Sequence, residues 1–147
     1  MNNTNEMVVE FNSVAQNESF ARMVVAAFIA STNPTLEEVS DVKTAVSEAV
    51  TNSIIHGYEQ KDGMVRIRAK VDKRLIYLEI IDEGKGIEDI EKAMEPMYTS
   101  RPEEDRSGMG FSFMEAFMDK ILVESQVGKG TVVKMWKEIG VIKHQYK

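Results

Sequence analysis

Glu48 and Asn52 form the first of three short clusters whose residue types could do chemistry. They stand four residues apart, so on a helix their side chains share one face. An Asn side chain offers a neutral oxygen that can bind Mg²⁺, and a glutamate can accept a proton from a hydroxyl group. The pair fits metal-dependent transfer chemistry, and it fits a solvated helix face as well.

The second cluster is Asp82-Glu-Gly-Lys-Gly86, at the end of an apolar run. Its aspartate could accept a hydrogen bond from an exocyclic amine such as that of adenine, and Gly84 and Gly86 would let the backbone approach a flat ring. The same residues are also ordinary turn chemistry. The third cluster, Ser107-Gly-Met-Gly-Phe111, precedes a helical segment, where free backbone N–H groups and the helix dipole favour phosphate.

Composition limits the kind of protein that carries these clusters. With 147 residues, 43% hydrophobic and 29% charged, residues 1–147 are predicted to form a single domain. A net charge of -6 argues against direct DNA binding, because affinity for phosphates depends on Lys and Arg. The lack of cysteine excludes disulfides and thiolate sites and fits a cytoplasmic protein. The longest wholly apolar run, 23–30, is far shorter than the roughly 20 residues of a membrane-spanning helix, so no membrane association is expected.

The N-terminal part is predicted to hold one strand and two helices. The β-type run at 7–11 predicts a short strand. Ser13 and Gln16 have the spacing of a capping box, which predicts a helix from there to about Ser31. A second box, Thr35 to Glu38, opens a helix whose apolar repeat continues to Gly57.

The C-terminal part is predicted to hold two hairpins separated by a loop. The expected elements are strands at 64–71, 75–81, 121–125 and 131–137 and helices at 89–94 and 111–119, with a loop over most of 87–107. This order predicts an α+β fold, a two-layer α/β sandwich in which helices cover one face of a mixed, mostly antiparallel sheet. Solvated lysines are expected at 129, 134, 137, 143 and 147.

Taken in order, the three clusters resemble the N, G1 and G2 boxes of the nucleotide site in the GHKL ATPase/kinase superfamily, whose Bergerat fold is such a sandwich. Thr131, after Gly128-Lys-Gly130, is similar to the Gly-x-Gly-Thr element that helps close the adenine pocket there. Longer segments are similar to the anti-sigma-F factor family of endospore-forming bacteria: ESFAR at 18–22, SEAVTN at 47–52, IIHGY at 54–58, DEGKGI at 82–87 and RSGMGF at 106–111.

This resemblance implies an ATP-dependent protein serine kinase that is also an anti-sigma factor. Such a protein is a cytoplasmic homodimer that uses ATP or ADP with Mg²⁺. It holds the sporulation sigma factor F inactive and phosphorylates a serine of the anti-anti-sigma factor. Two alternatives stay open: an anti-sigma-B-type stress-response kinase of the same fold, and an ATP-gated sigma-binding module without phosphoryl transfer. The carboxylate at Glu48 favours the kinase, because a binding switch needs the Mg²⁺ ligand but no base.

The resemblance also implies a role for each matching residue. Glu48 would be the general base, and Asn52 would bind Mg²⁺. Residues expected to bind the nucleotide are Asn52, Asp82, Gly84, Gly86, Ile87, Thr99, Arg106, Gly108, Met109, Gly110, Phe111 and Thr131. Residues 99–107 would form a lid over the nucleotide, from which Arg101 or Arg106 reaches the γ-phosphate. Arg22 would face protein partners.

Overall fold

The computed structural model describes residues 4–95 and 110–141, and its elements follow the predicted order. The strands are β1 (Thr4–Asn12), β2 (Met64–Asp72), β3 (Leu75–Asp82), β4 (Lys120–Gln126) and β5 (Gly130–Glu138). The α-helices are α1 (Asn17–Ile29), α2 (Leu36–Asn52), α3 (Ile90–Ala93) and α4 (Gly110–Phe117). A 3-10 turn, η1 (Ala30–Thr32), follows α1, and a π-helical turn, η2 (Ser53–Gly57), follows α2.

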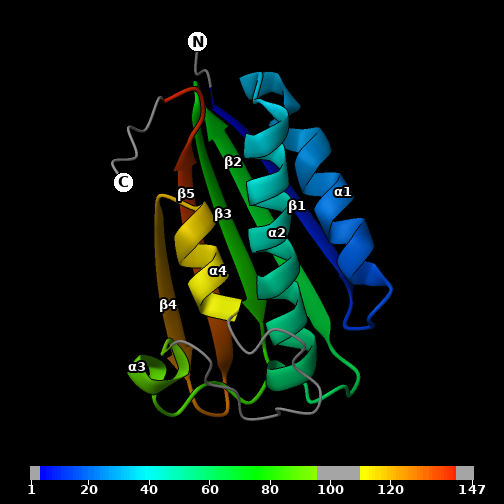
Figure 1. Ribbon diagram of the computed structural model, residues 1–147. Coiled ribbons are helices and arrows are strands. Elements are labelled where there is room, and N and C mark those ends of the chain that lie inside the picture. The colour runs from blue at the N-terminus through cyan, green and yellow to red at the C-terminus, as the bar shows by residue number, and fades with distance from the viewer. Residues whose placement is uncertain (1–3, 96–109, 142–147) are drawn as a thin grey trace.

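The five strands form one sheet in the order β1-β2-β3-β5-β4, and all four pairings between described strands are antiparallel. Strict alternation along β2 buries Val65, Ile67 and Ala69 and exposes the residues between them, which is the pattern of a sheet covered on one side. Figure 1 shows α1, α2 and α4 packed over that side. The predicted two-layer α+β sandwich is therefore confirmed.

The core lies between the sheet and these three helices. Fully buried positions on the helices include Val25 of α1, Val46 of α2 and Met114 of α4. They belong to the same hydrophobic core cluster as Ile67 and Leu78 of the sheet. Burying each such side chain is worth about 1.5–3 kcal/mol relative to exposure. None of the helices in the described part of the chain is long and apolar enough to cross a membrane.

The capping box at the start of α2 is confirmed. The Glu38 backbone N–H donates to Thr35 Oγ1 at 3.1 Å, and the Thr35 backbone N–H donates to Glu38 Oε1 at 2.9 Å. The other oxygen of this carboxylate accepts the Gly140 backbone N–H at 2.8 Å. Partial burial alone would raise the pKa of Glu38. The hydrogen bonds from Thr35 and Gly140 outweigh this effect, so the pKa lies below its ordinary value. The same side chain thus caps the helix and ties it to the segment after β5.

The predicted capping box at the start of α1 is wrong. The helix begins at Asn17, and no side chain caps its first turn. Ser13 is buried, and its hydroxyl donates instead to the Lys61 carbonyl oxygen at 2.9 Å. Local spacing predicted that the Ser13 hydroxyl would cap the helix, but it hydrogen-bonds to a residue 48 positions away. A buried polar group needs a hydrogen-bond partner, and here the fold supplies a distant one.

Lys137 is an exception to the expectation that the C-terminal lysines are solvated, and Lys143 and Lys147 lie outside the described residues. Alternation along β5 turns this residue toward the helices, where it is only 7% exposed. Its Nζ donates to the Phe117 carbonyl oxygen at 2.7 Å and lies 4.0 Å from an Asp41 carboxylate oxygen. The ammonium group therefore hydrogen-bonds to the carbonyl oxygen of the last residue of α4, where a positive charge is favoured.

Candidate functional site

Asp82, the last residue of β3, is a buried carboxylate with a fixed set of donors. It is 5% exposed, and its Oδ1 accepts the Gly84 backbone N–H at 2.9 Å. Burial raises its pKa, while hydrogen bonds from Gly84, the Ser53 hydroxyl and the Thr131 backbone N–H oppose that shift. Two carboxylate oxygens offer about four lone-pair positions, so Asp82 can accept one more donor, such as an exocyclic amine.

The turn η2, which follows α2, is packed directly against the segment that carries Asp82. A Cβ atom added at Gly57 would lie 3.0 Å from Asp82 Oδ1, and one added at Gly84 would lie 2.2 Å from the Gly57 carbonyl oxygen. That carbonyl also accepts the Lys85 backbone N–H at 2.9 Å. Ser53, whose hydroxyl hydrogen-bonds to Asp82, directly follows Asn52, so the first predicted cluster ends one residue before a partner of the second.

The glycines of the second cluster have a packing role that the sequence did not reveal. Gly86 adopts a φ of +80°, and a Cβ atom there would lie 2.3 Å from the Gln126 carbonyl oxygen. Gly130 has a φ of +121°, and a Cβ atom there would lie still closer to backbone, 2.0 Å from the Asp82 carbonyl oxygen. Gly84, Gly86 and Gly130 therefore allow the Asp82 loop to pack closely against the backbone of its neighbouring segments. The approach of Gly84 and Gly86 to a flat ring stays a prediction.

Tyr58 supports the same loop and was not singled out from the sequence. Its hydroxyl accepts the Glu83 backbone N–H at 2.7 Å and donates to the Met64 carbonyl oxygen at 2.6 Å. Burial raises the pKa of this hydroxyl, so it stays protonated and keeps both roles. The residue after Asp82 is thereby attached to the start of β2. The sequence pointed to Tyr58 only as the last residue of the segment Ile54–Tyr58, which is one of the segments that carry the family resemblance.

Ser125 of β4 is a second unpredicted member of the site. Its hydroxyl oxygen lies 2.8 Å from the Ile87 backbone N–H, 3.0 Å from the Gly130 carbonyl oxygen and 2.8 Å from Thr131 Oγ1. Thr131 is buried and stands opposite Asp82 in the β3–β5 register. One serine therefore joins Ile87, which follows the Asp82 loop, to Thr131 beside Asp82.

Glu48 and Asn52 lie on α2 at the predicted spacing, and both are half-buried. The described residues contain no group of three or more His, Cys, Asp or Glu side chains that could hold a metal ion. A single Asn oxygen fits Mg²⁺ that is bound largely by phosphates, since Mg²⁺ uses few protein ligands when phosphate oxygens are present. The donor set therefore suits a metal that arrives with a nucleotide.

Residues 107–109 of the third cluster, which include Gly108 and Met109, lie outside the described residues. So does the expected lid with Thr99 and Arg106. Gly110 begins α4, close to the predicted helix start, and Phe111 packs against the core. Figure 1 shows the beginning of α4, the end of α2 and the end of β3 at the same end of the molecule. Phosphate was predicted to bind at the start of a helix near residue 110. That helix, α4, starts at the end of the sheet that carries Asp82.

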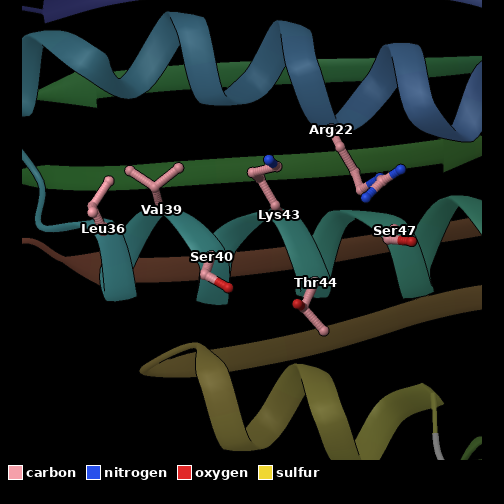
Figure 2. A pocket seen from close by; sticks show the side chains of 7 residues that line it. All are labelled: Arg22, Leu36, Val39, Ser40, Lys43, Thr44 and Ser47. Atoms are coloured by element: carbon pink, nitrogen blue, oxygen red, sulfur yellow. The ribbon is translucent and has the colours of Figure 1, made fainter.

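Arg22 lies elsewhere, in a groove between α1 and α2 shown in Figure 2. The groove has a volume of about 340 Å³ and is lined by Arg22, Leu36, Val39, Ser40, Lys43, Thr44 and Ser47. Arg22 Nε lies 3.2 Å from Glu18 Oε1, and the Ser47 hydroxyl donates to the same carboxylate. Leu36 is 91% exposed at one end of the groove. A cation held beside an exposed apolar side chain suits a protein partner.

Residues 12–137 match a family model described as a histidine kinase-like ATPase domain. The chain is 61% identical to the anti-sigma F factor of Thermoanaerobacter sp. (strain X514), over 95% of this chain and 98% of that protein. It is 60% identical to the anti-sigma F factor of Clostridium botulinum (strain Eklund 17B / Type B), over 94% of this chain and 97% of that protein. The chain belongs to the histidine kinase-like ATPase family and, within it, to the anti-sigma F factors.

A solved structure supports the fold independently. The RsbU and RsbW domains of a Mycobacterium tuberculosis protein superpose with a TM-score of 0.65 at 15% sequence identity. The match covers 92% of this chain and 32% of that longer chain. At this identity the likeness concerns the fold alone.

Proposed function

We propose that this chain is an anti-sigma factor and an ATP-dependent protein serine kinase, formed as one ATP-binding domain over residues 1–147. The observation that carries the proposal is the 61% identity to an anti-sigma F factor over 95% of the chain. Its client would be the sporulation sigma factor F, held inactive while nucleotide is bound. Its phosphorylation substrate would be a serine of the anti-anti-sigma factor.

Nucleotide binding would use the end of the sheet that carries Asp82. The buried carboxylate would accept the adenine amine, and Thr131 would stand beside it. Asn52 would hold Mg²⁺, which neutralises phosphate charge when bound. The segment from Gly108 to Gly110 would bind phosphate through backbone N–H groups, and Thr99 and Arg106 would also bind the nucleotide. The remaining capacity of the Asp82 carboxylate to accept a hydrogen bond supports this assignment.

Phosphoryl transfer to serine would use Glu48 as the base that accepts the hydroxyl proton. Its place on α2, one helical turn before Asn52, supports a position close to the metal and the phosphates. Transfer of this kind depends mainly on positioning and charge neutralisation. The chain would therefore combine a sigma-binding role with catalysis in one domain.

Incubation with γ-labelled ATP, Mg²⁺ and the purified anti-anti-sigma factor tests the kinase assignment. We expect label on a serine of that protein, and none when Mg²⁺ is chelated. Nucleotide-dependent sigma binding without any label would leave the ATP-gated binding module as the better function. Binding of a sigma-B-type factor in preference to sigma factor F would favour the stress-response alternative.

Partner binding would involve Arg22 in the α1–α2 groove, where the Glu18 carboxylate holds the guanidinium group beside α2. A homodimer would use the N-terminal strand and α1. Two apolar side chains of α1 support this, because Phe20 is 46% and Met23 62% exposed. Sedimentation with nucleotide present should give a dimer at micromolar concentration. A monomer under those conditions would remove the dimer from the proposal.

A further inference from the structure

Lys137 is a buried cation that neither the proposed catalysis nor the proposed nucleotide contacts use. Its side chain extends from β5 toward the helices, where its Nζ donates to the Phe117 carbonyl oxygen at 2.7 Å and lies 4.0 Å from an Asp41 carboxylate oxygen. Taking an ammonium group out of water is costly unless it is paired. The two partners belong to different helices, α4 and α2, so Lys137 links both of them to β5.

The apolar contacts of α4 define its position along its own axis only weakly. Between Phe111 and Met118 the buried residues are Met114 and Met118. Methionine side chains are unbranched and adapt to irregular spaces, so they tolerate small shifts of the helix that carries them. Directional hydrogen bonds at the end of α4 must therefore set how far along α2 it lies.

Asp119, directly after α4, attaches the chain to β5. Its backbone N–H donates to the Trp136 carbonyl oxygen at 2.8 Å, and its carboxylate accepts the Glu138 backbone N–H at 2.7 Å. These contacts join α4 to the sheet. Lys137 also reaches α2, through Asp41, and it thereby relates the position of α4 to that of α2.

The same two helices carry the proposed phosphate and metal groups at their other ends. They pack against each other, and the beginning of α4 lies at the same end of the molecule as the end of α2 (Figure 1). At 1.5 Å per residue, α4 is about 12 Å long, and about 16 Å separates Asp41 from Asn52 along α2. Helices this short bend little, so a shift at Phe117 moves the start of α4 relative to Asn52.

We propose that Lys137 is a positioning residue for phosphate binding. By joining the end of α4 to α2, it places the start of α4 at the correct distance from Asn52 and the phosphates of the nucleotide. This inference rests on the proposed nucleotide site. Backbone N–H groups at a helix start bind phosphate only within hydrogen-bond distance, so a small displacement weakens them. The adenine contact of Asp82 belongs to the sheet and should not depend on Lys137.

The ratio of the dissociation constants of adenosine and ADP, both measured with Mg²⁺, isolates the phosphate contribution. Calorimetry gives the value for ADP, and NMR titration follows adenosine into the millimolar range. Wild type should bind ADP more tightly than adenosine. Lys137→Met removes the ammonium group at similar length. Its ADP affinity should fall by about tenfold, the equivalent of one weakened hydrogen bond to a charged group, while its adenosine affinity stays unchanged.

Lys134→Met is the matched control, because it removes a lysine of the same strand that is paired with Glu124 on the other face of the sheet. It should leave both affinities unchanged. Equal losses of ADP affinity in the two lysine variants would mean that general charge attraction, and not the position of α4, is responsible, and would overturn the proposal. A Lys137→Met variant that keeps the wild-type ratio, or that loses affinity for adenosine and ADP equally, would overturn it as well.

Denaturant unfolding shows whether Lys137→Met is folded at the temperature of the titrations. If it is not, Asp41→Asn, which removes the charge at nearly constant size, takes its place. A fall in the ratio then supports the link between α4 and α2, and an unchanged ratio overturns it. Equal wild-type affinities for adenosine and ADP would overturn this inference and leave adenine binding at Asp82 in place. Failure of wild type to bind either compound would overturn the proposed function, and this inference with it.

Discussion

The end of the sheet around Asp82 and the groove around Arg22 are built in opposite ways. Asp82 is 5% exposed and is held by backbone groups and a short serine side chain. Arg22 lies at an open groove, where a long side chain is positioned by the Glu18 carboxylate. Backbone contacts pre-organise the first region for a small ligand. The second presents side chains that can adapt to a protein surface.

Glu48→Gln should produce the largest effect and should divide the two regions functionally. The substitution keeps the size of the side chain but removes the proton acceptor. Transfer to the anti-anti-sigma serine should fall by ~10²–10⁴-fold, the range typical of a lost general base. ADP affinity and sigma-factor binding should survive. A single-turnover rate equal to that of wild type would mean that Glu48 is a solvated residue on the helix face and not the general base.

Asn52→Ala should act differently from Glu48→Gln, although the residues are one helical turn apart. Loss of the metal ligand should abolish Mg²⁺-dependent nucleotide binding, and with it both transfer and sigma-factor capture. ADP titrations with Mg²⁺ and with chelator check this. Equal ADP affinities of wild type and variant in the presence of Mg²⁺ would remove Asn52 from the metal site.

Arg22→Ala should weaken sigma-factor binding by about 30-fold, equivalent to about 2 kcal/mol for an interface side chain that carries much of the binding energy. ADP affinity should not change, because the groove and the Asp82 region share no described hydrogen bond. Lys43→Ala is the matched control, since it removes a second cation from the same groove. Equal losses in both variants would mean that general charge attraction, and not Arg22, directs the partner.

Gly84→Ala tests how rigidly the nucleotide region is packed. The added methyl group would overlap the Gly57 carbonyl oxygen, so we expect a loss of about 1–3 kcal/mol in the free energy of unfolding together with weaker ADP binding. Gly128→Ala is the control, because nothing lies within 4 Å of the added atom. It carries only the backbone cost of its φ of +80° and should leave ADP affinity intact. Denaturant unfolding and ADP titration measure the two effects.

The smallest expected effect is the contribution of Asp82 to the pH dependence of stability. Burial raises its pKa above the ordinary value of 3.8, so the folded state binds more protons than the unfolded state between the two values. The free energy of unfolding contributed by this group therefore falls as pH rises through that interval. Asp82→Asn lacks this component, and its stability relative to wild type should rise with pH over the same range. A constant difference would contradict a raised pKa.

Much of the fold could be predicted because its signals are local. Apolar alternation located the strands to within a few residues, and the Thr35 capping box located the start of α2. Ser13 and Lys137 were misassigned because their partners, Lys61 and Phe117, are distant in sequence. Hydrogen bonds of that kind depend on the assembled sheet and have no local pattern.

The site divides in the same way. Asp82 could be singled out because it ends an apolar run before glycines, and the structure places it next to η2, the turn that follows α2. Ser125 and Tyr58 could not, since a lone hydroxyl in a strand or after a helix is common and its role arises only when β4, β3 and η2 are brought together. The packing role of Gly84 and Gly86 was hidden for the same reason.

Titration of ADP with Mg²⁺ into wild type and Asp82→Asn tests the central claim most directly, namely that the buried carboxylate at the end of β3 reads adenine. The amide would turn a donor toward the adenine amine at one of the positions where the carboxylate accepts. We expect the ADP affinity of Asp82→Asn to be lower by about 1.5–3 kcal/mol, the value of a hydrogen bond to a charged group, which is roughly 10- to 150-fold. Equal affinities for the two proteins would contradict it.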